Sequence, residues 1–189
     1  ISEINLLINS KVNNFAKILL AQRFNKVNYY TVKLEEYDMS LFGQFKRKHS
    51  IENREKLNHI LAWIKIIGNK YSAKADYFRN EAETADTSAL PPENPNWEPA
   101  YIEWDRELKT GETNNLRLYT FRANDHVVFL FSGDVKTADK AQNCPNVRPH
   151  FKLANEITKA LEQCFRTHEI TWNRGKTNIE FDKNLELNW

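Results

Sequence analysis

The sequence predicts an α+β fold, in which helices pack against a mainly antiparallel sheet and a C-terminal β-hairpin extends the domain. Residues 126–131 are almost uninterruptedly apolar, which is typical of a central strand covered on both faces. Two longer segments carry apolar residues at helical spacing, and residues 170–181 alternate around a polar turn. The chain has 189 residues, of which 41% are hydrophobic, so we expect a single domain, 1–189, around one core.

Two elements are expected before residue 40. Residues 11–24 carry apolar side chains at helical spacing, with Ser10 available as an N-cap. Residues 1–28 are therefore interpreted as an N-terminal helical extension. Residues 30–34 alternate between apolar and polar side chains, which predicts a half-buried strand.

The clearest helical pattern begins at Ser50, a favourable N-cap, and ends at Gly68. Its apolar stripe consists of Leu57, Ile60, Leu61, Ile64 and Ile67. A short strand is expected at residues 77–81. Residues 82–100 contain four prolines and are interpreted as an ordered insertion or lid, followed by a strand at residues 101–105.

The centre of the predicted sheet is a hairpin of residues 116–122 and 126–131. In the first strand, side chains two apart share a face, so Arg117, Tyr119 and Phe121 lie opposite Leu116 and Leu118. Another helix begins near Pro149 and carries an apolar stripe. Residues 29–166 then form the core of the domain, and residues 167–189 form the C-terminal hairpin.

Charge and cysteine content limit the class of protein. There are 27 Lys and Arg residues against 25 Asp and Glu residues, so the net charge of +2 produces no global field that would attract nucleic acid. Only Cys144 and Cys164 are present, which favours a cytoplasmic location over a secreted disulfide scaffold. No apolar run approaches the roughly 20 residues of a membrane span, so no membrane partner is expected.

Basic residues are spaced along and after the predicted hairpin: Arg117, Arg122, Lys136 and Lys140. RNA cleavage without a metal needs an activated 2′-hydroxyl, a stabilised phosphorane and a protonated leaving oxygen, which Lys, Arg, His and Tyr can provide. The spacing alone fits an ordinary solvated sheet better, because charged residues usually face solvent.

The stretch LRLYTFRANDHVVFLFSGDVKTADK, with the helix that follows it, resembles the RelE/HigB superfamily of toxin endoribonucleases, in particular its phage-like HigB branch. The resemblance covers about 50 residues. It implies a small antiparallel sheet with helices on one face and mRNA cleavage by 2′-hydroxyl attack, in some members on the ribosome. It also implies inhibition by a cognate antitoxin protein.

The resemblance assigns roles to individual residues. Arg117 would contact phosphate and Lys136 matches the basic exit from the apolar strand, while Arg122 and Lys140 are weaker matches that would bind RNA. Tyr119 or His126 would assist proton transfer. Thr137 stands where the family often has a second lysine. Because of this departure and the near-neutral charge, a non-catalytic binding or interaction protein on the same scaffold is the alternative.

Three further groups of residues have side chains that could bind RNA, a metal ion or a partner. Lys46, Arg47 and Lys48, with His49 after them, form either an RNA-binding patch or a polar loop. Cys144, His150, Cys164 and His168 have the ligand chemistry of zinc, but their spacing fits no familiar site, so no metal and no cofactor is expected. Among the tryptophans, Trp63 and Trp172 are expected in the core, and Trp97 is the one expected to contact a ligand or partner.

Overall fold

The computed structural model describes residues 15–81, 85–92, 114–138 and 140–189. In this part of the chain, a sheet of seven strands has the order β3-β4-β5-β6-β2-β1-β9, and a two-stranded hairpin packs beside it. All neighbouring strands are antiparallel except β2 and β6, which are parallel. The strands are β1 (Phe15–Arg23), β2 (Asn28–Leu34), β3 (Arg79–Asn80), β4 (Thr87–Leu90), β5 (Leu118–Arg122), β6 (Val127–Leu130), β7 (Ile170–Trp172), β8 (Ile179–Phe181) and β9 (Glu186–Asn188).

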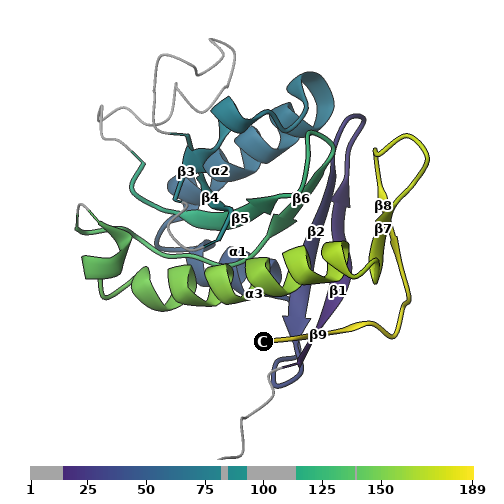
Figure 1. Ribbon diagram of the computed structural model, residues 1–189. Coiled ribbons are helices and arrows are strands. Elements are labelled where there is room, and N and C mark those ends of the chain that lie inside the picture. The colour runs from purple at the N-terminus through teal and green to yellow at the C-terminus, as the bar shows by residue number, and fades with distance from the viewer. Residues whose placement is uncertain (1–14, 82–84, 93–113, 139) are drawn as a thin grey trace, which may run out of the picture.

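Helices cover both faces of the sheet (Figure 1). Helices α1 (Leu41–His49) and α2 (Arg54–Ile66) pack on one face, and α3 (Arg148–Arg166) packs on the other with the β7–β8 hairpin. The expected α+β architecture with its C-terminal hairpin is therefore confirmed, whereas the helices lie on two faces and not on one. Three short helical turns complete the described elements: η1 (Ile67–Tyr71), η2 (Ala75–Tyr77) and η5 (Ala141–Asn143).

The core has two halves because side chains of the central strands alternate between the two faces. In β6, Val127 and Phe129 pack in the half under α3, whereas Val128 and Leu130 pack in the half under α1 and α2. All four side chains are fully buried. This explains the apolar run that predicted a central strand, since no face of β6 meets water.

Residues 15–23 form strand β1, so the helix predicted over residues 11–24 is wrong there, and residues 1–14 lie outside the described part of the chain. β1 pairs along most of β2 on one side and with β9 on the other. Ala16 and Ile18 alternate into the core, while Leu19 and Leu20 are 40% and 47% exposed. Backbone pairing with two neighbouring strands determines this structure and outweighs the helical spacing of the apolar residues.

The first face carries one helix that was not predicted, α1, and one, α2, that begins and ends differently from the prediction. Ser40 caps α1 by accepting a hydrogen bond from the Gly43 N–H at 3.1 Å, and Ser50 is the C-cap of α1. The second helix therefore starts at Arg54, after Asn53, although the predicted stripe does face the core. Beyond Ile66 the chain continues through the π-helical turn η1 and does not stop at Gly68.

The segment of residues 185–189 was expected to extend the C-terminal hairpin, and it instead joins the main sheet. β9 pairs antiparallel with β1, with Leu187 opposite Ala16, and the Leu187 side chain is fully buried. The Pro-rich insertion and the strand expected at residues 101–105 lie largely outside the described residues, as does Trp97. Within the insertion, Thr87–Leu90 forms β4, next to β5.

Candidate functional site

A cavity of about 1010 Å³ lies beyond the carboxyl ends of β2, β6 and β9. From β2 the chain passes to α1 on one face, and from β6 it passes to α3 on the other. Two parallel neighbours whose connections leave to opposite faces open a crevice between them, and ligands of open α/β sheets bind at such points. The topology and the volume together mark this cavity as the candidate site, because ligand pockets measure roughly 300–1,000 Å³.

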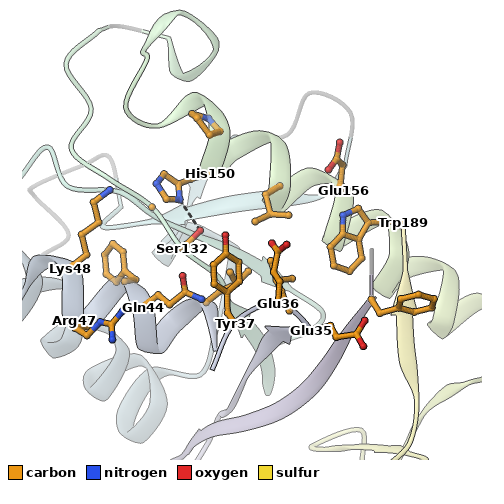
Figure 2. A pocket seen from close by; sticks show the side chains of 17 residues that line it. Glu35, Glu36, Tyr37, Gln44, Arg47, Lys48, Ser132, His150, Glu156 and Trp189 are labelled. Atoms are coloured by element: carbon orange, nitrogen blue, oxygen red, sulfur yellow. Dashed lines mark hydrogen bonds between the residues drawn. The ribbon is translucent and has the colours of Figure 1, made fainter. Parts of the chain in front are cut away.

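One end of the cavity is basic. Arg47 and Lys48 lie in the last turn of α1, and His150 lies in the first turn of α3 (Figure 2). Lys48 Nζ is 2.7 Å from Asp134 Oδ2, so this cation is already paired. The Arg47 carbonyl oxygen accepts from Ser50, but the Arg47 guanidinium has no hydrogen bond or ion pair within the part of the chain that the structure describes. Arg47 is thus available to an anionic ligand.

Among the described residues that line the cavity, His150 is the one histidine. Its Nδ1 atom is 2.9 Å from the Ser132 hydroxyl oxygen, which also lines the cavity. Burial lowers the pKa of His150, and the positive charge of Lys48 acts in the same direction. The imidazole is therefore neutral at pH 7, the state that a general base needs.

A second histidine, His49, holds the wall in place from behind. It is 1% exposed, its Nε2 lies 3.3 Å from the Gly133 carbonyl oxygen, and its Nδ1 lies 3.1 Å from the Asn53 amide. Burial lowers the pKa of His49, so this imidazole is neutral as well and donates from Nε2 to the carbonyl. His49 acts as a positioning residue for the segment that carries Ser132 and Asp134.

Asp134 belongs to the same supporting network. Burial alone would raise the pKa of its carboxyl, but hydrogen bonds from Lys48 and from the Val135 N–H outweigh that effect and keep the pKa below its ordinary value. The ionised carboxylate pairs with Lys48 and so links the end of α1 to the segment that follows β6. This ion pair helps to fix the spacing of the two basic-end walls.

The other end of the cavity is acidic and aromatic. The loop after β2 contributes Glu36, the residue after β9 contributes Trp189, and Tyr37 lies between the two ends (Figure 2). Figure 2 shows Glu36 and Tyr37 pointing into the cavity toward the side that carries Ser132 and His150. The Glu36 carboxylate, like the Arg47 guanidinium, has no hydrogen bond or ion pair among the described residues. The cavity therefore presents a cation at one end and a carboxylate at the other.

Arg117 and Tyr119 were predicted to act on RNA from an open sheet face, and this placement is wrong. They do share the α3 face, as expected, but α3 covers that face. Arg117 is 6% exposed and donates from a guanidinium nitrogen to the Asn114 carbonyl oxygen at 2.7 Å. Tyr119 is 0% exposed, packs on Phe151, and has its pKa raised by burial. Neither side chain lines the cavity.

Arg122 and His126 lie at the opposite end of the β5–β6 hairpin from the cavity. Arg122 pairs with Asp125 at 2.9 Å and donates to the Ala73 carbonyl oxygen at 3.3 Å. His126 Nδ1 is 2.8 Å from the Lys26 carbonyl oxygen. The predicted basic set is therefore divided between the two ends of the central strands and does not converge.

The remaining predicted residues have mixed placements. Lys136 is half-buried after β6, where its backbone N–H donates to the Asn115 carbonyl oxygen, and Lys140 is exposed before η5. Lys46 lies over the Phe42 ring at 4.9 Å, outside the cavity lining. Among the predicted RNA-binding residues, Arg47 and Lys48 are the two that line the cavity.

Sequence reasoning missed the residues that meet across the cavity: Glu36, Tyr37, Ser132, His150 and Trp189. Two features of the sequence pointed to these residues. The segment Ser132-Gly133-Asp134 comes at the end of the predicted central strand, and His150 follows the proline in the first turn of α3. Among the described residues no group of three His, Cys, Asp or Glu side chains is placed to hold a metal ion.

Comparison of the chain with protein-family models, with curated proteins and with solved structures gives no match. None of the helices in the described segments has the length and apolar character needed to cross a membrane. The function must therefore be argued from the cavity.

Proposed function

We propose that this protein is an endoribonuclease that cleaves mRNA without a metal, the toxin component of a toxin–antitoxin pair, and that its active site is the cavity beyond β2 and β6. The observation that carries the proposal is the neutral His150 facing a cavity whose rim bears the unpaired Arg47. A neutral imidazole beside a guanidinium supplies both a base for a hydroxyl and a charge for a phosphate.

The arrangement supports one balanced sequence of steps. His150 accepts the proton of the ribose 2′-hydroxyl as the O2′–P bond forms. Arg47, with Lys48 behind it, stabilises the negative charge on the phosphorane oxygens. The P–O5′ bond breaks, and the leaving oxygen takes a proton from the Tyr37 hydroxyl. The products are a 2′,3′-cyclic phosphate and a 5′-hydroxyl, and water returns the proton from His150 to Tyr37.

Ser132 has a positioning role in this scheme. Its hydroxyl lies 2.9 Å from His150 Nδ1, and this contact orients the ring so that Nε2 faces the cavity. Ser132 is itself 6% exposed and lies two residues beyond the buried strand β6, where its carbonyl oxygen accepts a hydrogen bond from the Tyr119 N–H. The base is thus held by a rigid element of the sheet, which favours catalysis because little reorganisation is required.

The test is cleavage of a defined single-stranded RNA in the presence of EDTA, with product ends identified by mass spectrometry. Arg47→Ala combined with Lys48→Ala should lower RNA affinity by about tenfold or more and flatten its salt dependence. Lys65→Ala is the matched control, because Lys65 is exposed on α2 and absent from the cavity lining. A wild-type protein that binds RNA and never cleaves it would instead support the non-catalytic binding protein.

The assignment as a toxin has its own test in cells. Inducible expression should arrest growth, and His150→Gln should relieve the arrest without lowering the amount of folded protein. The proposed partners are mRNA, free or on the ribosome, and an antitoxin protein that blocks the cavity mouth. Growth arrest that persists in the His150→Gln variant would assign the toxicity to another surface.

A further inference from the structure

The charge of the cavity changes sign along its length. Arg47, Lys48 and His150 form the basic end, and Glu36 and Trp189 define the acidic end, near which Glu156 of α3 also lies (Figure 2). The proposed chemistry uses the basic end and leaves Glu36 and Trp189 without a task. A cavity with a free cation at one end and a free carboxylate at the other suits a ligand whose own ends differ in the same way.

A nucleotide of single-stranded RNA is such a ligand. Its phosphate is anionic, and its base offers an aromatic face for stacking and polar edges for hydrogen bonds. Proteins that bind single strands place aromatic side chains under splayed bases, and an indole ring is a suitable platform. Trp189 is a half-buried indole on the cavity wall, held in place by β9, which pairs with β1.

Glu36 adds selectivity to this end. An ionised carboxylate accepts hydrogen bonds and donates none, so it favours a base edge that presents N–H groups. The Watson–Crick edge of guanine presents two adjacent donors, N1–H and the exocyclic amino group, which match the two oxygens of one carboxylate. Adenine presents an acceptor nitrogen beside its amino group and would leave one carboxylate oxygen facing a lone pair.

We propose that the acidic end of the cavity is a guanine-recognition subsite, in which Trp189 stacks on the base and Glu36 accepts hydrogen bonds from N1–H and the amino group. This inference rests on the proposed function, since it places the guanine nucleotide beside the phosphate that is cleaved. It defines the substrate class as RNA with guanosine at the cleavage site.

The test measures equilibrium binding of guanosine, inosine and adenosine 3′-monophosphates to the intact protein by calorimetry. Guanosine monophosphate should bind about tenfold to a hundredfold more tightly than adenosine monophosphate, as a bidentate base contact would give. Inosine, which keeps N1–H and lacks the amino group, should fall between them. Glu36→Gln should remove most of the preference, because an amide can also donate to adenine.

Two controls separate recognition from general effects. Glu180→Gln makes the same change of charge on exposed β8, away from the cavity, and should leave the preference intact. Trp189→Leu should weaken all three nucleotides alike and preserve their order. Equal affinity for guanosine and adenosine monophosphates, survival of the preference in Glu36→Gln, or no binding at millimolar concentration would each overturn the inference.

The two proposals fail in different ways. RNA that is cleaved with no preference for guanosine would keep the endoribonuclease and remove the subsite. Selective binding of guanosine monophosphate without RNA cleavage would keep the subsite and remove the endoribonuclease.

Discussion

The two ends of the central strands contain the same kinds of residue and use them differently. At the hairpin turn, Arg122 is paired with Asp125, and His126 contacts a backbone carbonyl oxygen. At the cavity, one ring nitrogen of His150 contacts the Ser132 hydroxyl, and the Arg47 guanidinium has no hydrogen bond or ion pair among the described residues. Arginine and histidine at the turn join loops, whereas at the cavity they remain available.

The difference teaches that residue type is a weak guide to function without the topology. The turn end joins two antiparallel neighbours, β5 and β6, and local hydrogen bonds satisfy its polar groups. The cavity end lies where the parallel strands β2 and β6 send their connections to opposite faces. Only the second arrangement leaves a space that a ligand can enter.

The largest expected effect concerns Gly133, which lies on the cavity wall in the segment after β6. A Cβ atom at Gly133 would lie 1.7 Å from the Arg117 carbonyl oxygen, so Gly133→Ala must displace the backbone. We expect the free energy of unfolding to fall by about 3 kcal/mol or more, measured by chemical denaturation. At the other end, Gly175→Ala would meet nothing nearer than 3.7 Å and should change it by less than about 0.5 kcal/mol. A fully stable Gly133→Ala variant would contradict the close approach.

The two histidines give the next largest effect. His150→Gln should lower the rate of RNA cleavage by about 10²–10⁴-fold, the usual contribution of a general base. His126→Gln should leave the rate within about twofold of wild type, since the His126 ring contacts the Lys26 carbonyl oxygen and lies outside the cavity lining. Similar losses in both variants would break the contrast between the two ends.

The pH profile of cleavage should show a smaller effect with a defined sign. Burial lowers the pKa of His150, so the neutral base persists below the ordinary histidine value of about 6.5. The midpoint of the fall in rate on the acid side should therefore lie below pH 6.5. Lys48→Met removes a charge that lowers this pKa, so the acid limb should move to higher pH. A wild-type midpoint at or above pH 6.5 would show that the base is a different group.

The smallest expected effect comes from one carboxylate at each end. Asp134→Asn and Asp125→Asn break the ion pairs with Lys48 and Arg122, and each should cost at most about 1 kcal/mol of stability because the pairs are partly exposed. Only Asp134→Asn should tighten RNA binding, because it frees a cation inside the cavity. An equal gain in both variants would mean that RNA responds to net charge alone.

The sheet and the last helix could be predicted because burial dictates their sequences. The strand β6 is covered on both faces and is apolar throughout, and α3 carries its stripe toward one half of the core. The N-terminal strand could not be recognised in the same way. Phe15, Ala16 and Leu19 fit helical spacing. Most of the pairing of β1 is with β2, and the second partner, β9, comes from the far end of the described chain.

The helix α1 was missed although its cap was present in the sequence. The Ser40 hydroxyl accepts a hydrogen bond from the Gly43 N–H. However, Gly43 is a poor helix former, and the basic run after it interrupts the apolar stripe that predicts a helix. No sequence pattern indicated that the residues of the cavity wall meet. Its walls combine segments from β1 through the residue after β9, and their meeting depends on sheet register and on which face each connection takes.

The pairing of β9 with β1 has a consequence for the order of synthesis. Phe15 and Trp189 both line the cavity, and Asn188 pairs with Phe15, so the wall closes only when the last described strand joins the first. The cavity can therefore be complete only after Trp189 has been synthesised and has left the ribosome. If the cavity carries the proposed cleavage, a nascent chain that has not yet reached this point is inactive.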